Sequence, residues 1–209
     1  MATAVVEGRP CAVTGGRAGT VRLWDLATGD QVGEPLTGHR GWVTAVTTAV
    51  IDGRAHAVTS GRDGRLRVWD LTSRQMVGDP LAGHDGWVTA LTTVVIDGRL
   101  HVAVGGRDGT VRVRNLATGQ QVGEPVTGQG RKTSRMATLV IDGSPHAVTG
   151  GQYGRVRVWD LITGRPVGEP MTGHGGRVWA VTTVVIEGRA HAVTGGGDGT
   201  VRVWDLTAG

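Results

Sequence analysis

The feature that most constrains the fold of this chain is a sequence repeat of 45 residues that never slips by a single position. An alternating run, usually ending in Trp-Asp-Leu, marks the repeat at 20–26, 65–71, 110–116, 155–161 and 200–206. The 209 residues therefore hold about 4.6 copies of one unit. A fixed period of this length is typical of architectures in which each unit packs only against its neighbours, so we expect a repeat protein.

We treat the chain as a single array, 1–209, of five units. These are a partial unit at 1–37, units at 38–82, 83–127 and 128–172, and a unit at 173–209 that lacks its last strand.

Each unit predicts four β-strands, which we name a, b, c and d. In the unit 38–82 they fall at 42–51, 55–60, 65–71 and 76–83. Strand c alternates between apolar and polar side chains, which is typical of a half-buried strand. Pro80 places strand d at an edge, because proline donates no ladder hydrogen bond. No helical period is present, so we expect an all-β fold.

Composition excludes several classes of protein. The single cysteine, Cys11, excludes a disulfide framework and a cysteine-based zinc site. The longest apolar window, 41–51, is too short to span a bilayer, and the first residues do not resemble a signal peptide, so we expect a cytoplasmic protein with no membrane contact. A formal charge of only +4, with carboxylates interleaved and no aromatic stacking platform, argues against nucleic acid as a partner.

Taken together, these motifs resemble the WD40 repeat. A Gly-His pair, a strand–turn–strand, an Asp-Gly turn and VRVWDL recur in register over essentially the whole chain. The resemblance implies a β-propeller of about five four-stranded blades, incomplete or imperfectly closed, with strand a innermost. It implies a non-catalytic protein-interaction scaffold without cofactor or metal. Bacterial arrays of this kind are often attached to kinase or NTPase regulatory domains, so the alternative is the sensor portion of a larger regulatory protein.

The family's structural tetrad joins a His before strand a, a Ser or Thr on strand b, an Asp in the b–c turn and a Trp on strand c. By position it is complete in two units, as His39, Thr59, Asp63 and Trp69, and as His174, Thr194, Asp198 and Trp204. Five substitutions break it elsewhere: Ala18, Val104, Arg114, Gln129 and Tyr153. We expect these blades to be softer, because a buried polar group left unpaired costs about 1–3 kcal/mol. The segment 128–140 departs furthest from the template, by drift or by specialisation.

Strand direction puts the d–a and b–c loops on one face and the a–b and c–d turns on the other. The first set varies between units, and variable loops on a rigid scaffold are where binding residues concentrate. The resemblance implies the same partner-binding face. Its candidate contact residues are Arg40, Trp42, Arg62, Trp87, Arg107, Arg131, Lys132 and Arg177. Aromatic and basic groups together suit an acidic or phosphorylated protein or peptide; the alternative is that each Trp only fills space between blades.

Three patterns imitate reactive sites. The Thr, His and Asp of each tetrad resemble a nucleophilic triad, but a catalytic site has no reason to recur at 45-residue spacing. The glycine-rich loops at 105–110 and 195–200 precede strands, whereas phosphate loops precede helices. One strand-b register contains His56, His101, His146 and His191, with Cys11 in the same place. We expect these to pack rather than to bind a metal, because neighbouring blades are too far apart for shared coordination.

Strand c carries an arginine in every unit, at positions 22, 67, 112, 157 and 202. We expect packed aliphatic stems and exposed guanidinium groups.

The two ends of the array leave three alternatives. Met1 aligns inside strand a and the last unit stops after strand c, so we count 19 expected strands. The first alternative is a fragment of a longer array or the product of a truncated gene, the second is a small five-bladed ring that is imperfectly sealed, and the third is a module completed by self-association. In the last case, open strand edges at 2–6 and 201–206 would pair with another chain.

Overall fold

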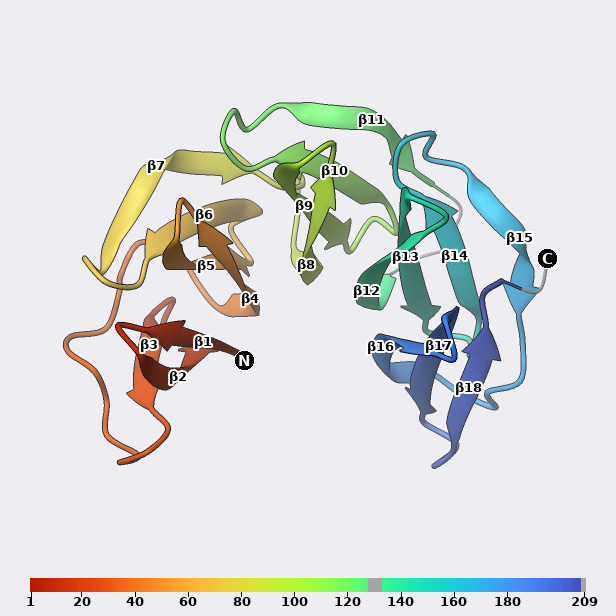
Figure 1. Ribbon diagram of the computed structural model, residues 1–209, viewed down its shortest axis with the longest axis horizontal. Helices are drawn as coiled ribbons and strands as arrows, with labels where there is room; N and C mark the ends of the chain where they lie inside the picture. Colours follow the sequence, from red (N-terminus) through yellow and green to blue (C-terminus); the bar gives the residue numbers. More distant parts are fainter. Residues whose placement is uncertain (128–132, 208–209) are drawn as a thin grey trace. The chain divides into compact units, whose positions relative to one another are not determined.

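The computed structural model describes residues 1–127 and 133–207, and these residues form an all-β protein (Figure 1). They contain no helix, and hence none with the length and apolar character needed to cross a membrane. The chain divides into two compact units, Met1–Thr93 and Val94–Gly209, with the boundary inside one strand.

The described residues form five antiparallel sheets, each built from consecutive strands. The first sheet contains β1 (Ala2–Val6), β2 (Arg9–Gly15) and β3 (Val21–Asp25). The second contains β4 (Val43–Ile51), β5 (Arg54–Gly61), β6 (Arg65–Asp70) and β7 (Gln75–Ala82). The third contains β8 (Val88–Ile96), β9 (Arg99–Gly106), β10 (Val111–Asn115) and β11 (Gln121–Val126). The fourth contains β12 (Thr133–Ile141), β13 (Ser144–Gly151), β14 (Val156–Asp160) and β15 (Pro166–Met171). The fifth contains β16 (Val178–Ile186), β17 (Arg189–Gly196) and β18 (Val201–Asp205). Each sheet is one blade.

The a–b hairpins have the tightest turns, and their sequence explains them. In the second blade Asp52 and Gly53 both have positive φ, 49° and 73°, and Ile51 pairs with Arg54. Two consecutive residues of positive φ are what a type I′ turn requires, and Asp-Gly is the favoured pair. The other four blades repeat the geometry with Asp-Gly or Glu-Gly, which fixes the register of strands a and b.

Strand d of the first blade differs from the prediction, so 18 strands rather than 19 lie in the described residues. The segment 31–36 pairs with β3 only through two isolated bridges, Val21 with Leu36 and Trp24 with Gln31. In the three complete blades the c–d pairing also shifts register through a bulge. In the first blade the same interruption leaves no continuous strand, although its glycine, Gly33, has the positive φ that Gly78, Gly123 and Gly168 also have.

Neighbouring blades within each unit pack in the same way. In the first unit an apolar cluster joins Val13, Val21 and Leu23 of the first blade to Val43 of β4. In the second unit Val148, Val156 and Val158 of the fourth blade pack on Val178 of β16 in the fifth. A small residue at the end of strand b makes room for this contact. In the first blade it is Gly15, where an added Cβ would lie 2.7 Å from Val43 Cβ. The contact between the first and second blades and that between the fourth and fifth blades therefore use equivalent positions of the repeat.

Candidate interaction face and the tetrads that support it

The tetrad of the second blade is a chain of hydrogen bonds centred on the Thr59 hydroxyl. The Trp69 indole N–H donates to Thr59 Oγ1 at 2.8 Å. Thr59 Oγ1 lies 2.8 Å from His39 Nε2, and His39 Nδ1 lies 3.2 Å from Asp63 Oδ1. With Nδ1 protonated, a neutral imidazole donates to Asp63 and accepts from Thr59, so both ring nitrogens of His39 have a partner.

Burial and hydrogen bonding set the charges of this tetrad. Burial, together with the nearby Arg67 charge, lowers the pKa of His39 against the opposing effect of Asp63. Burial alone would raise the pKa of Asp63, but hydrogen bonds from the Arg40 N–H, His39 and the Arg65 N–H lower it overall. A neutral His39 beside an ionised Asp63 follows at neutral pH.

Arg67 also belongs to this hydrogen-bond network, and the sequence analysis did not predict that role. Its guanidinium Nη1 donates to Asp63 Oδ2 at 2.8 Å, and only 7% of the residue is exposed. The expectation of an exposed guanidinium is therefore wrong at this position. The carboxylate four residues earlier in the chain pairs with Arg67 Nη1 inside the protein, whereas Arg67 Nε is buried without a partner. The recurrence of Arg on strand c was the only signal in the sequence.

The fifth blade has the same arrangement. Trp204 Nε1 donates to Thr194 Oγ1 at 2.8 Å, Thr194 Oγ1 lies 2.8 Å from His174 Nε2, and His174 Nδ1 lies 3.2 Å from Asp198 Oδ1. The Gly175 N–H and the Thr200 hydroxyl both donate to Asp198 and hold the pKa of this carboxyl far below its usual range.

The incomplete blades keep part of the network. In the first and fourth blades the indole–hydroxyl bond remains, Trp24 to Thr14 and Trp159 to Thr149, each at 2.8 Å. In the third blade Arg114 replaces Trp, and its Nη1 donates to the Gly119 carbonyl at 3.1 Å.

Four of the residues on the face of the d–a and b–c loops form an alternating stack, which we call the Arg–Trp stack: Arg17, Trp42, Arg62 and Trp87. The guanidinium carbon of Arg62 lies 3.6 Å from the ring centroid of Trp42 and 3.9 Å from that of Trp87. Arg17 lies over Trp42 at 4.5 Å. Cation–π contacts of this length are worth about 0.5–2 kcal/mol each. The stack joins the b–c turns of the first and second blades to the d–a loops that follow them.

Three other predicted contact residues lie outside the Arg–Trp stack. The Arg40 and Arg107 side chains are exposed. Arg177 is half-buried and lies 4.4 Å over Trp179, which is 52% exposed. Sequence reasoning missed Trp179, whose only signal is that Arg177 takes the position of Trp42 in the repeat. Gln129, Arg131 and Lys132 lie outside the described residues.

The strand-b histidines bond within their own blades. Each Nδ1 lies 2.8–3.0 Å from the carbonyl oxygen two residues earlier, in His56, His101, His146 and His191. Within 1–127 and 133–207, no group of three or more His, Cys, Asp or Glu side chains could hold a metal ion.

Comparison with known families defines the class of protein to which these blades belong. Three segments match the family model of the WD domain, G-beta repeat: 29–70, 76–115 and 164–205. They make up more than half of the chain, and two of them contain the complete tetrads. The chain belongs to the WD40 repeat family, whose propellers generally serve as protein-interaction scaffolds. A search of curated proteins gave no match.

A double-mutant cycle tests the tetrad. Thr59→Val leaves the Trp69 N–H and the His39 ring nitrogen without their shared partner, so we expect a loss of about 2–3 kcal/mol in the free energy of unfolding. Combining it with Trp69→Phe should cost less than the sum of the two single changes. Urea unfolding followed by circular dichroism measures each value. The matched control, Thr14→Val, removes only the bond to Trp24 and should cost less; equal losses at both positions would contradict this assignment.

The pKa shifts predict acid sensitivity. Both His39 and Asp63 have pKa values below their ordinary 6.5 and 3.8, so the unfolded chain binds more protons than the folded one as the pH falls. Stability should therefore decline below about pH 6.5 through His39, and again below about pH 4 through Asp63. Thermal unfolding at constant ionic strength measures both. In His39→Gln the first decline should flatten, and an unchanged profile above pH 5 would exclude a role for His39.

Proposed function

We propose that the protein is a non-catalytic scaffold that binds an acidic protein or peptide on the face of the d–a and b–c loops. The observation that carries the proposal is the Arg–Trp stack. Trp42 remains 37% exposed and Arg17 is exposed, so flat apolar surface and positive charge are presented together. Trp and Arg are the residue types most enriched among interface hot spots, and guanidinium groups bind carboxylates and phosphates in a bidentate manner.

Stacking also orders this surface before a partner arrives. Arg62 is held between two indole rings, so neither its side chain nor those of Trp42 and Trp87 must lose much rotamer freedom on binding. Immobilising such a side chain otherwise costs about 0.5–1.5 kcal/mol. Both interpretations of the tryptophans, as partner contacts and as side chains that fill space between blades, contribute to the proposal. The rings pack between blades, and the exposed part of Trp42 is available for contact.

An acidic peptide tests this face. We expect a glutamate-rich, fluorescein-labelled peptide to raise fluorescence anisotropy saturably with the wild-type chain, more weakly at higher salt. Arg40→Ala combined with Trp42→Ala should weaken binding by about tenfold or more. The control variant Arg9→Ala removes an exposed arginine in the first blade next to its a–b turn and should bind normally. Equal losses in both variants would indicate only nonspecific charge attraction and would exclude this site.

We propose self-association as a second candidate function, favoured by the exposed face of the fifth blade. Val201 and Val203 on β18 are 73% and 58% exposed. Their counterparts in the first and fourth blades are 0–7% exposed, because strand a of the following blade packs on them. We propose that a second copy of the chain supplies the missing cover.

Sedimentation equilibrium over a range of concentrations tests self-association. We expect wild-type mass to rise with concentration and Val201→Arg to stay monomeric, because a buried charge would be unpaired in the contact. Val185→Arg is the matched control: Val185 is 66% exposed, and its counterpart is exposed in every blade. A wild-type chain that is monomeric throughout would remove this candidate.

A further inference from the structure

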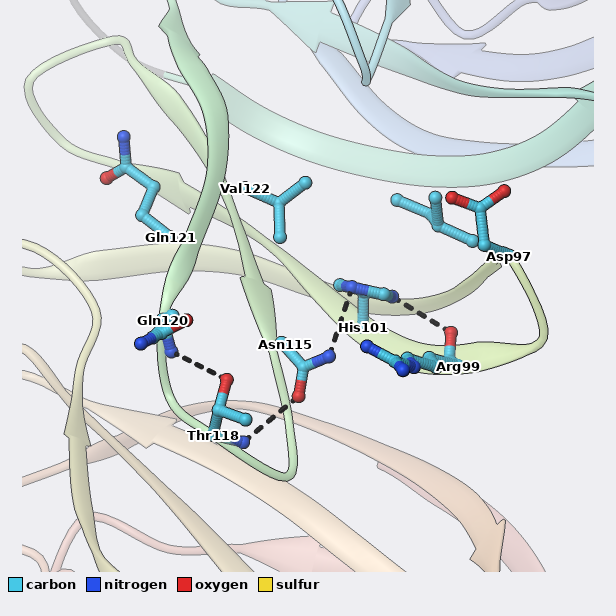
Figure 2. Close-up of a pocket in the computed structure, with 9 residues that line it drawn as sticks. Asp97, Arg99, His101, Asn115, Thr118, Gln120, Gln121 and Val122 are labelled. Carbon is cyan, nitrogen blue, oxygen red and sulfur yellow. Dashed lines mark hydrogen bonds between the residues drawn. The ribbon is translucent and has the colours of Figure 1, made fainter.

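A polar pocket of about 500 Å³ lies in the third blade, at the end of its strands that carries the a–b and c–d turns (Figure 2). This volume is within the range of small-molecule sites, about 300–1,000 Å³. Nine residues line it: Ile96, Asp97, Arg99, His101, Asn115, Thr118, Gln120, Gln121 and Val122. Two of them, His101 and Asn115, are buried polar residues, 5% and 9% exposed.

The corresponding place in other blades shows what is unusual here. In the second blade Asp70 uses its two carboxylate oxygens differently. Oδ1 accepts the Thr72 and Ser73 N–H groups at 2.8 and 3.0 Å, and Oδ2 lies 3.4 Å from Arg54 Nη1. The fifth blade repeats the ion pair between Arg189 and Asp205 at 3.3 Å. The aspartate therefore closes the turn with one oxygen and neutralises an arginine with the other.

The third blade keeps the arginine but not the aspartate. Asn115 Oδ1 still closes the turn, accepting the Ala117 and Thr118 N–H groups at 2.9 and 3.0 Å. Its Nδ2 stands in place of the second oxygen and lies 3.4 Å from His101 Nε2. Arg99 takes the position of Arg54, and within the described residues it has no ion pair.

The third blade therefore has two hydrogen-bond donors, Arg99 and Asn115 Nδ2, where the second blade has a donor, Arg54, and its acceptor, the second oxygen of Asp70. The Arg99 guanidinium and the Asn115 amide both line the pocket, and Asn115 has a second N–H beyond the one directed to His101. His101 Nδ1 is occupied, because it lies 2.9 Å from the Arg99 carbonyl oxygen. What the site lacks, relative to the second and fifth blades, is one negatively charged oxygen.

We propose that this pocket binds a carboxylate ligand, with one ligand oxygen in the position that the strand-c aspartate Oδ2 holds in the second and fifth blades. Arg99 and Asn115 donate to that carboxylate, and Thr118, Gln120 and Gln121 provide polar contacts for the remainder of the ligand. A single guanidinium matches a single negative charge. Asp97, also in the lining, repels any anion, and it repels a doubly charged phosphate about twice as strongly as a carboxylate, which favours the carboxylate of the two. The same chemistry is available from a free small carboxylate or from a peptide C-terminus.

Amide chemical shifts measure this binding directly. We expect sodium acetate to shift the Ala117 and Thr118 backbone resonances saturably in a ¹H–¹⁵N spectrum, and neutral acetamide to leave them unchanged. Acetyl-diglycine with a free carboxylate, compared with its C-terminal amide, separates the two sources. Tighter binding of the free peptide than of acetate assigns the site to a peptide end; equal binding assigns it to a small carboxylate.

Asn115→Asp is the decisive variant, because it restores the residue that the other four blades carry and should fold normally. Its own carboxylate should pair with Arg99 and weaken acetate binding by about tenfold or more. Arg99→Gln should have the same effect. Arg54→Gln, at the matching position of the second blade, should bind acetate as wild type does. Absence of saturable shifts in the wild type, or binding that persists in Asn115→Asp, would overturn the proposal.

Discussion

In four of the five blades the strands depend on one hydrogen bond, from the strand-c indole N–H to the strand-b threonine hydroxyl. It has the same length, 2.8 Å, in four blades. A buried indole N–H has no alternative to such an acceptor, so the bond fixes the two strands side by side. In the second and fifth blades the hydroxyl also meets a histidine from the d–a loop, and that histidine meets the aspartate of the b–c turn. The buried histidine therefore fixes the d–a loop and the b–c turn of these two blades, which both lie on the proposed interaction face.

Much of the fold could be predicted because its determinants are local and repeated. Asp52 and Gly53 specify a tight hairpin by their own conformational preferences, and the alternation of 65–71 specifies a strand without reference to the rest of the chain. The role of Arg67 could not be read in this way. Whether its guanidinium reaches water or Asp63 depends on where the b–c turn places that carboxylate in space, and the sequence spacing alone permits both.

The candidate sites show the same division. Trp42 and Arg62 could be named from residue type and loop position, but not their mutual stacking, which requires the d–a loop of one blade to meet its own b–c turn and that of the blade before. Asn115 was visible as a departure from Trp-Asp. Its meaning emerged only from the contacts of Asp70, since the same position closes a turn in both blades and carries a charge in only one.

The small residue at the end of strand b, where the next blade packs, has a consequence for how the number of repeats can change in evolution. Gly15 and Gly150 each leave room for the first valine of the next blade, and Ser60 occupies the same position with a buried hydroxyl that has no partner. These three junctions are thus built to one pattern, so each accepts a neighbour of the same kind. Recombination between two units of the gene, adding or removing 45 residues in register, would create a junction that is already compatible with folding. The number of blades can then vary without a new interface having to arise.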